Sequence, residues 1–255
     1  MNKQRFFIAA REAGSVRNDL PLWGAKIENP MELSDTCALQ VIREDILSVP
    51  GAFQLLNVLS KEECQNFIQA TEALGYTDDA AVSLPRSVRH NSNLTWIADD
   101  TTADILWQRS KVNFTDKHNH FLGKQPVGLN GRCRFYRYQS GDFFSIHTDG
   151  SWPGSRIVDG QVISNAFEGC WSMYTFLVFL TDDYEGGHTQ FLVNSENPEL
   201  PARGRANSET VNVRTPAGSV LCFPHGEHPL HCLHGSQDIV SGTKYIIRSD
   251  VLFEG

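Results

Sequence analysis

The sequence lacks several patterns that mark common functional classes. No C-x-x-C pair joins any of its six cysteines. This spacing gives a disulfide framework no support, so the simplest interpretation is reduced thiols in an intracellular protein, in the cytoplasm or the nucleus. The absence of G-x-G-x-x-G and Walker A motifs leaves dinucleotide and P-loop binding without support. H-E-x-x-H is also absent, which disfavours a hydrolytic zinc site.

Long apolar runs and an excess of positive charge are missing as well. The apolar run near the start, FFIAA, is only five residues long, which is too short for the core of a signal peptide. No stretch approaches the length of a membrane-spanning helix. The net charge of −8 argues against broad phosphate binding. We therefore expect neither a membrane nor a nucleic acid as partner.

The composition is that of a globular protein with a sizeable core. Of the 255 residues, 40% are hydrophobic and 20% are charged. Residues 1–45 are weakly periodic and are predicted to form an N-terminal extension packed on the core. Residues 46–255 are predicted to form one domain. It opens with a Pro-Gly turn and a strand within residues 48–60.

Helix signals come early in this domain. Ser60 and Glu63 form an S-x-x-E capping box, which predicts a helix from residue 61 that stops at Gly75. A second helix is predicted over residues 101–114. Its expected apolar positions are Ala103, Leu106, Trp107 and Val112.

Strand signals dominate after residue 130. Five short segments are rich in β-branched and aromatic residues, and Gly, Pro, Asp and Ser separate them. They are RCRFYRYQSGDFFSIH, SMYTFLVFLTDD, GGHTQFLV, GSVLCFPH and TKYIIRSDVLF. Helices followed by many strands favour an α+β protein with a mainly β core, in which helices pack on the outside of a barrel or sandwich.

The stretch FFSIHTDGSW places His147 and Asp149 two positions apart. With nine histidines and aspartate at about 6% of residues, roughly half an H-x-D pair is expected by chance. On a strand end, however, residues two apart point to the same side. Two imidazoles and one carboxylate on one face of an octahedron suit iron(II) and leave positions open. A histidine from a distant strand would complete such a site.

Four histidines in FPHGEHPLHCLHG could supply this ligand: His225, His228, His231 and His234. Pro224 and Pro229 argue against a continuous helix. In an extended segment a spacing of three alternates faces, so the second and fourth histidines would share one face and the first and third the other. Spacing alone leaves the choice open.

The strand predicted after these histidines carries two cations. Lys244 and Arg248 lie four residues apart and therefore on one strand face. A site that uses an anionic co-substrate needs a fixed cation one co-substrate length from the metal. The alternative is that both are solvated strand residues.

Taken in order, these motifs resemble the 2-oxoglutarate- and iron(II)-dependent dioxygenases, specifically the prolyl 4-hydroxylase-like branch. Residues 138–149 resemble the family's Y-x-x-G-x-x-[YF]-x-x-H-x-D motif. Residues 175–191 resemble its strand, acidic turn and G-G-x-T-x-F segment. Residues 218–225 resemble the strand before the distal histidine, and residues 234–245 the segment from that histidine to the pocket lysine.

The resemblance implies a double-stranded β-helix, a jelly-roll barrel, braced by the N-terminal helices. It implies three iron ligands: His147, Asp149 and His234. For the 2-oxoglutarate carboxylate it implies Tyr138, Thr189, Lys244 and, as a second candidate, Arg248. The three remaining histidines of residues 223–235 fall outside the motif and are interpreted as surface residues or neighbours of the ligands. Besides Fe(II), 2-oxoglutarate and O2, ascorbate is a candidate cofactor.

Two departures from the family pattern bear on the substrate. Collagen-type members often carry a tryptophan six residues after the pocket lysine, where this chain has Asp250. The segment between Asp149 and Thr175 is long. Both weaken the expectation of a collagen-like proline. Loops at the barrel mouth are expected to choose the substrate, namely residues 84–96 and residues 150–172 with Trp152, Arg156 and Trp171.

The implied reaction is hydroxylation of an unactivated C–H bond, with release of succinate and carbon dioxide. A prolyl residue in a peptide or protein is the first substrate prediction, and a free amino acid or another small molecule is the second. The alternative from another class is a catalytically silent barrel that binds a metal or a partner. Loss of a ligand or of the pocket cation would mark such a protein, and the sequence retains all of them.

Overall fold

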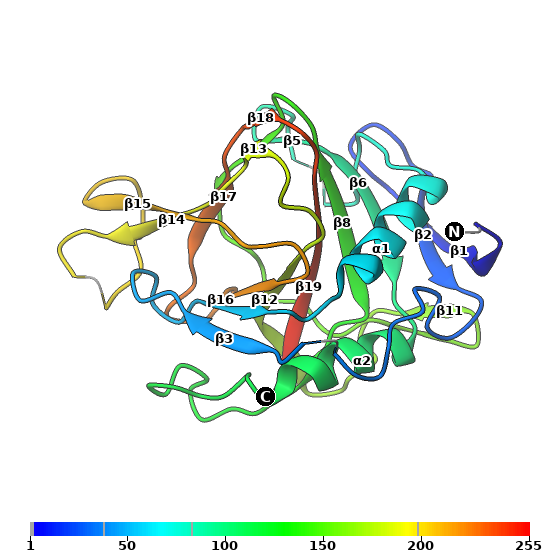
Figure 1. Cartoon of the computed structure of the whole chain (residues 1–255), viewed down its shortest axis with the longest axis horizontal. Coiled ribbons are helices and arrows are strands. Elements are labelled where there is room, and N and C mark those ends of the chain that lie inside the picture. Colours follow the sequence, from blue (N-terminus) through cyan, green and yellow to red (C-terminus); the bar gives the residue numbers. More distant parts are fainter. Residues whose placement is uncertain (1–2, 38, 83, 198) are drawn as a thin grey trace.

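The computed structural model describes residues 3–37, 39–82, 84–197 and 199–255, and within them the strands form two main sheets (Figure 1). The larger sheet has the order β1-β2-β6-β8-β19-β12-β16-β4-β3, with β7 paired to β19. Its strands are β1 (Phe6–Glu12), β2 (Leu20–Ala25), β3 (Ile42–Asp45), β4 (Phe53–Leu56), β6 (Ser92–Ile97), β7 (Pro126–Leu129), β8 (Arg132–Tyr138), β12 (Cys170–Phe179), β16 (Val220–Pro224) and β19 (Lys244–Glu254).

The smaller sheet has the order β15-β14-β17-β9-β5. Its strands are β5 (Arg89–His90), β9 (Phe143–His147), β14 (Thr189–Asn194), β15 (Ser208–Val213) and β17 (Leu233–Ser236). Two short strand pairs lie outside these sheets: β10 (Arg156–Val158) with β11 (Gln161–Ile163), and β13 (Glu185–Gly186) with β18 (Ile239–Ser241). The strands expected after residue 130 are therefore confirmed.

The two faces of the larger sheet belong to different cores. Along β8 and β12 successive side chains point to opposite faces, as the strand period of two requires. Phe135 and Phe176 join the cluster that also contains the buried helix residues, whereas Tyr136 and Leu177 join the cluster between the sheets. Because both faces are covered, the central strands read as nearly continuous apolar runs.

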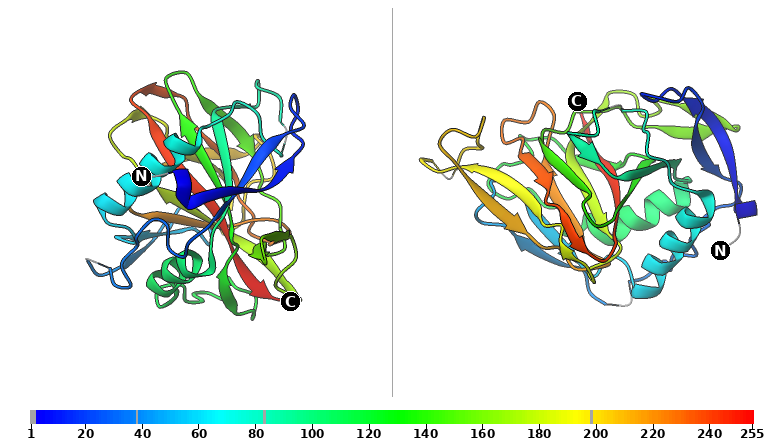
Figure 2. Two further views of the ribbon diagram at one scale, coloured as in Figure 1. Left: turned by 90° about the vertical axis from the view of Figure 1, so that its right-hand side faces the viewer. Right: turned by 90° about the horizontal axis from the view of Figure 1, so that it is seen from above.

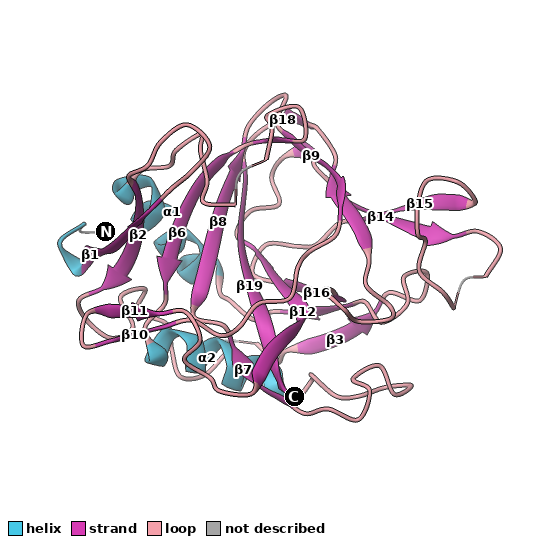
Figure 3. Cartoon of the chain, turned by 180° about the vertical axis from the view of Figure 1, so that it is seen from behind, coloured by secondary structure: helices cyan, strands magenta, loops and turns pink. Residues whose placement is uncertain are grey.

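The two α-helices lie on the outer face of the larger sheet (Figures 2 and 3). Helix α1 (Lys61–Leu74) begins with the predicted capping box, in which the Ser60 hydroxyl accepts from the Glu63 amide and the Glu63 carboxylate accepts from the Ser60 amide. Gly75 follows with a φ of 96°. Helix α2 (Asp100–Lys111) is shorter than predicted. Val112 therefore lies at its end and is 72% exposed, which corrects the expectation that it packs inward.

The first 45 residues contribute strands to both ends of the larger sheet. Strand β2 pairs in parallel with β6, and β1 pairs with β2 at the edge. Strand β3 pairs with β4, the strand expected after the Pro-Gly turn. A short 3-10 helix (Lys3–Arg5) precedes β1. The division of the chain at residue 45 stays a prediction.

The jelly-roll arrangement is confirmed. Within the described ranges its two main sheets remain separate in their hydrogen bonding. All six cysteines are free thiols. In the part of the chain that is described, no helix has the length and apolar character needed to cross a membrane.

Candidate metal centre

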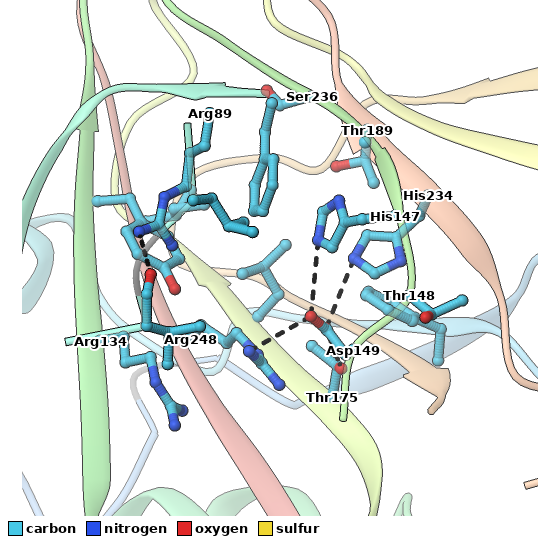
Figure 4. A pocket seen from close by; sticks show the side chains of 18 of the residues that line it. Arg89, Arg134, His147, Thr148, Asp149, Thr175, Thr189, His234, Ser236 and Arg248 are labelled. Atoms are coloured by element: carbon cyan, nitrogen blue, oxygen red, sulfur yellow. Dashed lines mark hydrogen bonds and ion pairs between the residues drawn. The ribbon is translucent and has the colours of Figure 1, made fainter. Parts of the chain in front are cut away.

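Two histidines from neighbouring strands and an aspartate just beyond one of them converge at one end of the smaller sheet. His147 closes β9 and is the direct cross-strand partner of His234 on β17. Asp149 lies two residues beyond the end of β9. Its Oδ1 is 3.6 Å from Nε2 of His147, and its Oδ2 is 3.5 Å from Nε2 of His234 (Figure 4). The ligand atoms of all three lie within 4.8 Å of one another.

Both imidazoles are oriented as metal ligands. Nδ1 of His147 donates to the carbonyl of Ser145 at 2.8 Å, and Nδ1 of His234 donates to the carbonyl of Cys232 at 3.1 Å. With its proton on Nδ1, a neutral imidazole in either position presents the Nε2 lone pair to the cluster. Burial, followed by the nearby His147, lowers the pKa of His234 to about 3. This imidazole is therefore neutral at physiological pH, as ligation requires.

The carboxylate of Asp149 is buried but ionised. Burial raises its pKa, but the Arg248 guanidinium outweighs this effect and holds the pKa well below its usual value. Nη1 of Arg248 lies 3.3 Å from Oδ1 of Asp149. Two neutral imidazoles and one carboxylate are a donor set that suits iron(II). The residues present therefore fit the metal that the motif implies.

A chain of hydrogen bonds holds the carboxylate of Asp149 in place. Thr175 donates from Oγ1 to Oδ2 of Asp149 at 2.8 Å. The Thr175 hydroxyl has a single proton, so Nδ1 of His225, also at 2.8 Å, must donate to it. Nε2 of a neutral His225 then accepts from the hydroxyl of Ser172 at 2.8 Å. Ser172 in turn accepts from the backbone N–H of Trp152 at 2.9 Å. Burial lowers the pKa of His225, which favours this neutral form.

The other candidate histidines lie outside the described ligand cluster. His225 and His228 are 1% and 3% exposed, so neither lies on the surface, and His225 is instead a neighbour of the ligands through Thr175. Nε2 of His228 donates to the carbonyl of His120 at 2.6 Å. His231 is partly exposed and contacts Arg203. Sequence spacing could not separate these roles, because residues 225–232 form turns rather than a strand.

A cavity of about 220 Å³ opens beside the three ligands, and both sheets line it. Lys244 lies in its wall and is 1% exposed. Its Nζ donates to the carbonyl of Gly187 at 2.7 Å and to the hydroxyl of Ser236 at 3.0 Å. Tyr138 is the cross-strand partner of Lys244, and Thr189 is the partner of Ser236. Burial, followed by Arg214, lowers the pKa of Lys244 to about 7.

The two cations of β19 have different partners. Arg248 contacts two carboxylates, Asp149 at 3.3 Å and Asp250 at 3.0 Å. Burial lowers the pKa of Arg248, but these carboxylates outweigh it and raise the pKa above its usual value. Lys244 donates to neutral oxygens only, among the contacts seen in the described ranges. Its charge is therefore left to receive an incoming anion.

The predicted substrate loops meet the cavity only in part. Leu84 and Arg89 from the first loop and Trp152 from the second line it. Arg156 instead forms an ion pair with Asp100 of α2, and Trp171 is 52% exposed on β12. Neither is among the described residues that line the cavity, and their role in substrate binding stays a prediction.

Sequence reasoning missed some cavity residues. Arg134 and Tyr136 line it, and strand alternation back from Tyr138 could have found them. No local signal marks Thr175 or His225, because their roles depend on contacts between strands.

No protein-family model matches the sequence. None of the curated proteins matches it either. Solved structures, by contrast, share the fold of this chain, and prolyl hydroxylases are among them.

Two structures illustrate this likeness. One is a prolyl hydroxylase from Trichoplax adhaerens in complex with a peptide fragment of the hypoxia inducible factor oxygen degradation domain. The match has a TM-score of 0.52 at 14% identity and covers 80% of this chain and 84% of that one. The other is the viral collagen prolyl hydroxylase of Paramecium Bursaria Chlorella virus-1 in its 2OG complex. It has a TM-score of 0.50 at 15% identity and covers 82% and 99% of the two chains.

Proposed function

We propose that this protein is a 2-oxoglutarate- and Fe(II)-dependent dioxygenase that hydroxylates an unactivated C–H bond. Substrate, 2-oxoglutarate and O2 would give hydroxylated substrate, succinate and carbon dioxide. The observation that carries the proposal is the convergence of His147, Asp149 and His234, with both Nε2 atoms free and the carboxylate ionised. Iron(II), when bound there, would supply the redox chemistry that couples the decarboxylation to oxygen insertion.

The protein's own residues would position the co-substrate. Lys244 would pair with the distal carboxylate of 2-oxoglutarate, and Tyr138 and Thr189 would line the same end of the cavity. Arg248 would hold Asp149 in the ionised form in which it binds metal. The surrounding apolar walls, which include Phe223 and Ile246, would keep water from the reacting centre.

The sequence resemblance supports a prolyl residue of a peptide or protein as the first substrate candidate. The structural neighbour from Trichoplax adhaerens holds a peptide fragment. A small-molecule substrate is the second candidate, and one observation favours it. A further buried cation, Arg134, lines the cavity of this chain. The intracellular location expected from the cysteines stays part of the proposal.

Spectroscopy under anaerobic conditions tests the reaction class. Fe(II) with 2-oxoglutarate should give a visible charge-transfer band in the wild-type protein and none in His234→Ala. The matched control is His231→Ala, which should keep the band. A band that survives in His234→Ala but disappears in His231→Ala would mean that the ligand assignment is wrong. A complete absence of succinate formation under aerobic conditions would instead favour a silent metal-binding protein.

A further inference from the structure

The wall of the cavity opposite the 2-oxoglutarate end carries a second, unsatisfied cation. Arg134 on β8 lines the cavity and is only 7% exposed. Its Nη1 is buried and has no hydrogen-bond partner within the described residues. The nearest carboxylate oxygen, Oδ2 of Asp250, is 3.7 Å away and is itself without a hydrogen bond. A buried guanidinium in this state loses its hydration without full compensation.

The neighbours of Arg134 further raise the free-energy cost of burying its charge. Arg134 is the direct cross-strand partner of Arg248, so two like charges lie opposite each other in the same sheet. Asp250 contacts both of them, and Arg248 also contacts Asp149. The Arg134 guanidinium lies 5.4 Å from the centre of the Trp152 ring. Figure 4 shows Arg134 and Arg248 on the same side of Asp149, away from the two histidines. An arrangement of side chains that lowers the stability of the free protein is often part of a functional site.

A charge count shows that 2-oxoglutarate alone does not neutralise the cavity. The charged lining residues, apart from the histidines, are Arg89, Arg134, Lys244, Arg248 and Asp149. Four cations and one carboxylate give +3, and the buried Asp250 behind them lowers the sum to +2 (3 − 1). A divalent metal and the 2-oxoglutarate dianion cancel each other. The loaded cavity would therefore keep a positive charge.

Lys244 and Arg134 are too far apart for one co-substrate to reach both. Lys244 pairs with Tyr138 and Arg248 pairs with Arg134, so the two pairs lie four residues apart along β8 and β19. Four residues of strand span about 13 Å, whereas a five-carbon chain spans at most about 6 Å. The head groups do not converge either, because Lys244 reaches Gly187 and Ser236 whereas Arg134 lies by Asp250 and Trp152.

We propose that Arg134 binds a carboxylate of the substrate, and that the substrate is a small anionic molecule rather than a prolyl residue inside a peptide. This inference rests on the proposed function and names its substrate class. A planar carboxylate matches the fork of a guanidinium. Bound there, it would offset the charge of the Arg134 guanidinium and relieve the repulsion between Arg134 and Arg248. Its carbon skeleton would then lie between Arg134 and the metal ligands.

Anion-dependent stabilisation tests the site without any turnover. The protein is loaded anaerobically with Fe(II) and 2-oxoglutarate, and its melting temperature is measured in acetate and in chloride at equal ionic strength. Acetate should stabilise the wild type by about 2 °C or more over chloride. Arg134→Met keeps the apolar stem and should lose this difference. The matched control is Arg137→Met, on the opposite face of β8 and paired with Glu72, which should keep it.

The possible outcomes distinguish a failure of the Arg134 anion site from a failure of the proposed reaction class. No difference between the anions in the wild type, or an equal difference in Arg134→Met, overturns the assignment of Arg134. If the wild-type protein shows no charge-transfer band but is still stabilised by acetate, the proposed function is overturned and the assignment of the anion site is retained. In a mass-spectrometric screen of small carboxylic acids and their primary amides, the acids alone should gain one oxygen. Hydroxylation of an internal prolyl peptide at an unchanged rate in Arg134→Met would overturn the substrate class.

Discussion

Oγ1 of Thr175 donates a 2.8 Å hydrogen bond to Oδ2 of Asp149, and Nδ1 of His225 holds Thr175 in place at the same distance. Asp149 lies just after β9 of the smaller sheet, whereas Thr175 lies on β12 of the larger one. The orientation of this carboxylate therefore depends on how the two sheets pack. It also depends on residues that no metal-binding motif contains.

Removing this hydroxyl should weaken metal binding. Thr175→Val keeps the shape of the side chain but leaves Oδ2 of Asp149 without its donor. We expect the dissociation constant for Fe(II) or Co(II) to rise by about 10- to 100-fold, as measured by anaerobic titration. Thr181→Val is the control, because Thr181 bonds the carbonyl of Thr243 away from the ligands. Equal metal affinity in Thr175→Val and the control would show that the hydroxyl does not position the carboxylate.

Loss of the pocket lysine should raise the requirement for 2-oxoglutarate. Lys244→Ala removes a charge-assisted contact worth about 1.5–3 kcal/mol, which corresponds to roughly a 10- to 100-fold weaker affinity. Titration of the charge-transfer band with 2-oxoglutarate measures this change. The exposed Lys124→Ala is the control. An unchanged requirement in Lys244→Ala would transfer the anchoring role to Arg248.

Binding of 2-oxoglutarate should depend on pH through the same lysine. Burial, followed by Arg214, lowers the pKa of Lys244 to about 7. Only the ammonium form pairs with a carboxylate, so the affinity should be fully present below this pKa and fall as the pH rises through it. Lys244→Arg keeps its charge at every accessible pH and should flatten the dependence. The check is a series of titrations across this range. An equally steep fall in Lys244→Arg would exclude the lysine as its source.

A buried ion pair outside the cavity should control stability. The Glu63 carboxylate caps α1 and lies 2.7 Å from Nη2 of Arg109, and both side chains are almost fully buried. Glu63→Gln leaves the Arg109 charge buried and unpaired, which should cost about 3–5 kcal/mol of unfolding free energy. Denaturant titration measures this loss.

The neighbouring exposed residue provides the control for this pair. Glu62→Gln should change the unfolding free energy by no more than about 0.5 kcal/mol. Burial raises the pKa of Glu63, but Arg109 and the backbone donors outweigh it and lower the pKa overall. The stabilisation from the ionised Glu63 should therefore be present above the pKa that Glu63 has in the unfolded state. It should disappear as the pH falls through the pKa that Glu63 has in the folded state. A loss in Glu63→Gln no larger than in Glu62→Gln would contradict a structural role for the pair.

Local patterns alone determined much of this protein. The capping box at Ser60 and Glu63 placed the start of α1, because its hydrogen bonds join residues three apart. Strand periodicity placed Lys244 and Arg248 on one face, and H-x-D placed two ligands on one side of a strand end. The order of the motifs carried the family resemblance, which implied the jelly roll and His234.

Only the tertiary structure decided how these parts interact. It separated Lys244, with its neutral partners, from Arg248, which two carboxylates already hold. It brought Arg134 beside Arg248, and His225 behind Asp149 through Thr175. Periodicity reports which face a residue occupies, because the backbone repeat is local. The partner across the sheet depends on register and on the packing of two sheets, and these are set by contacts between segments far apart in the sequence.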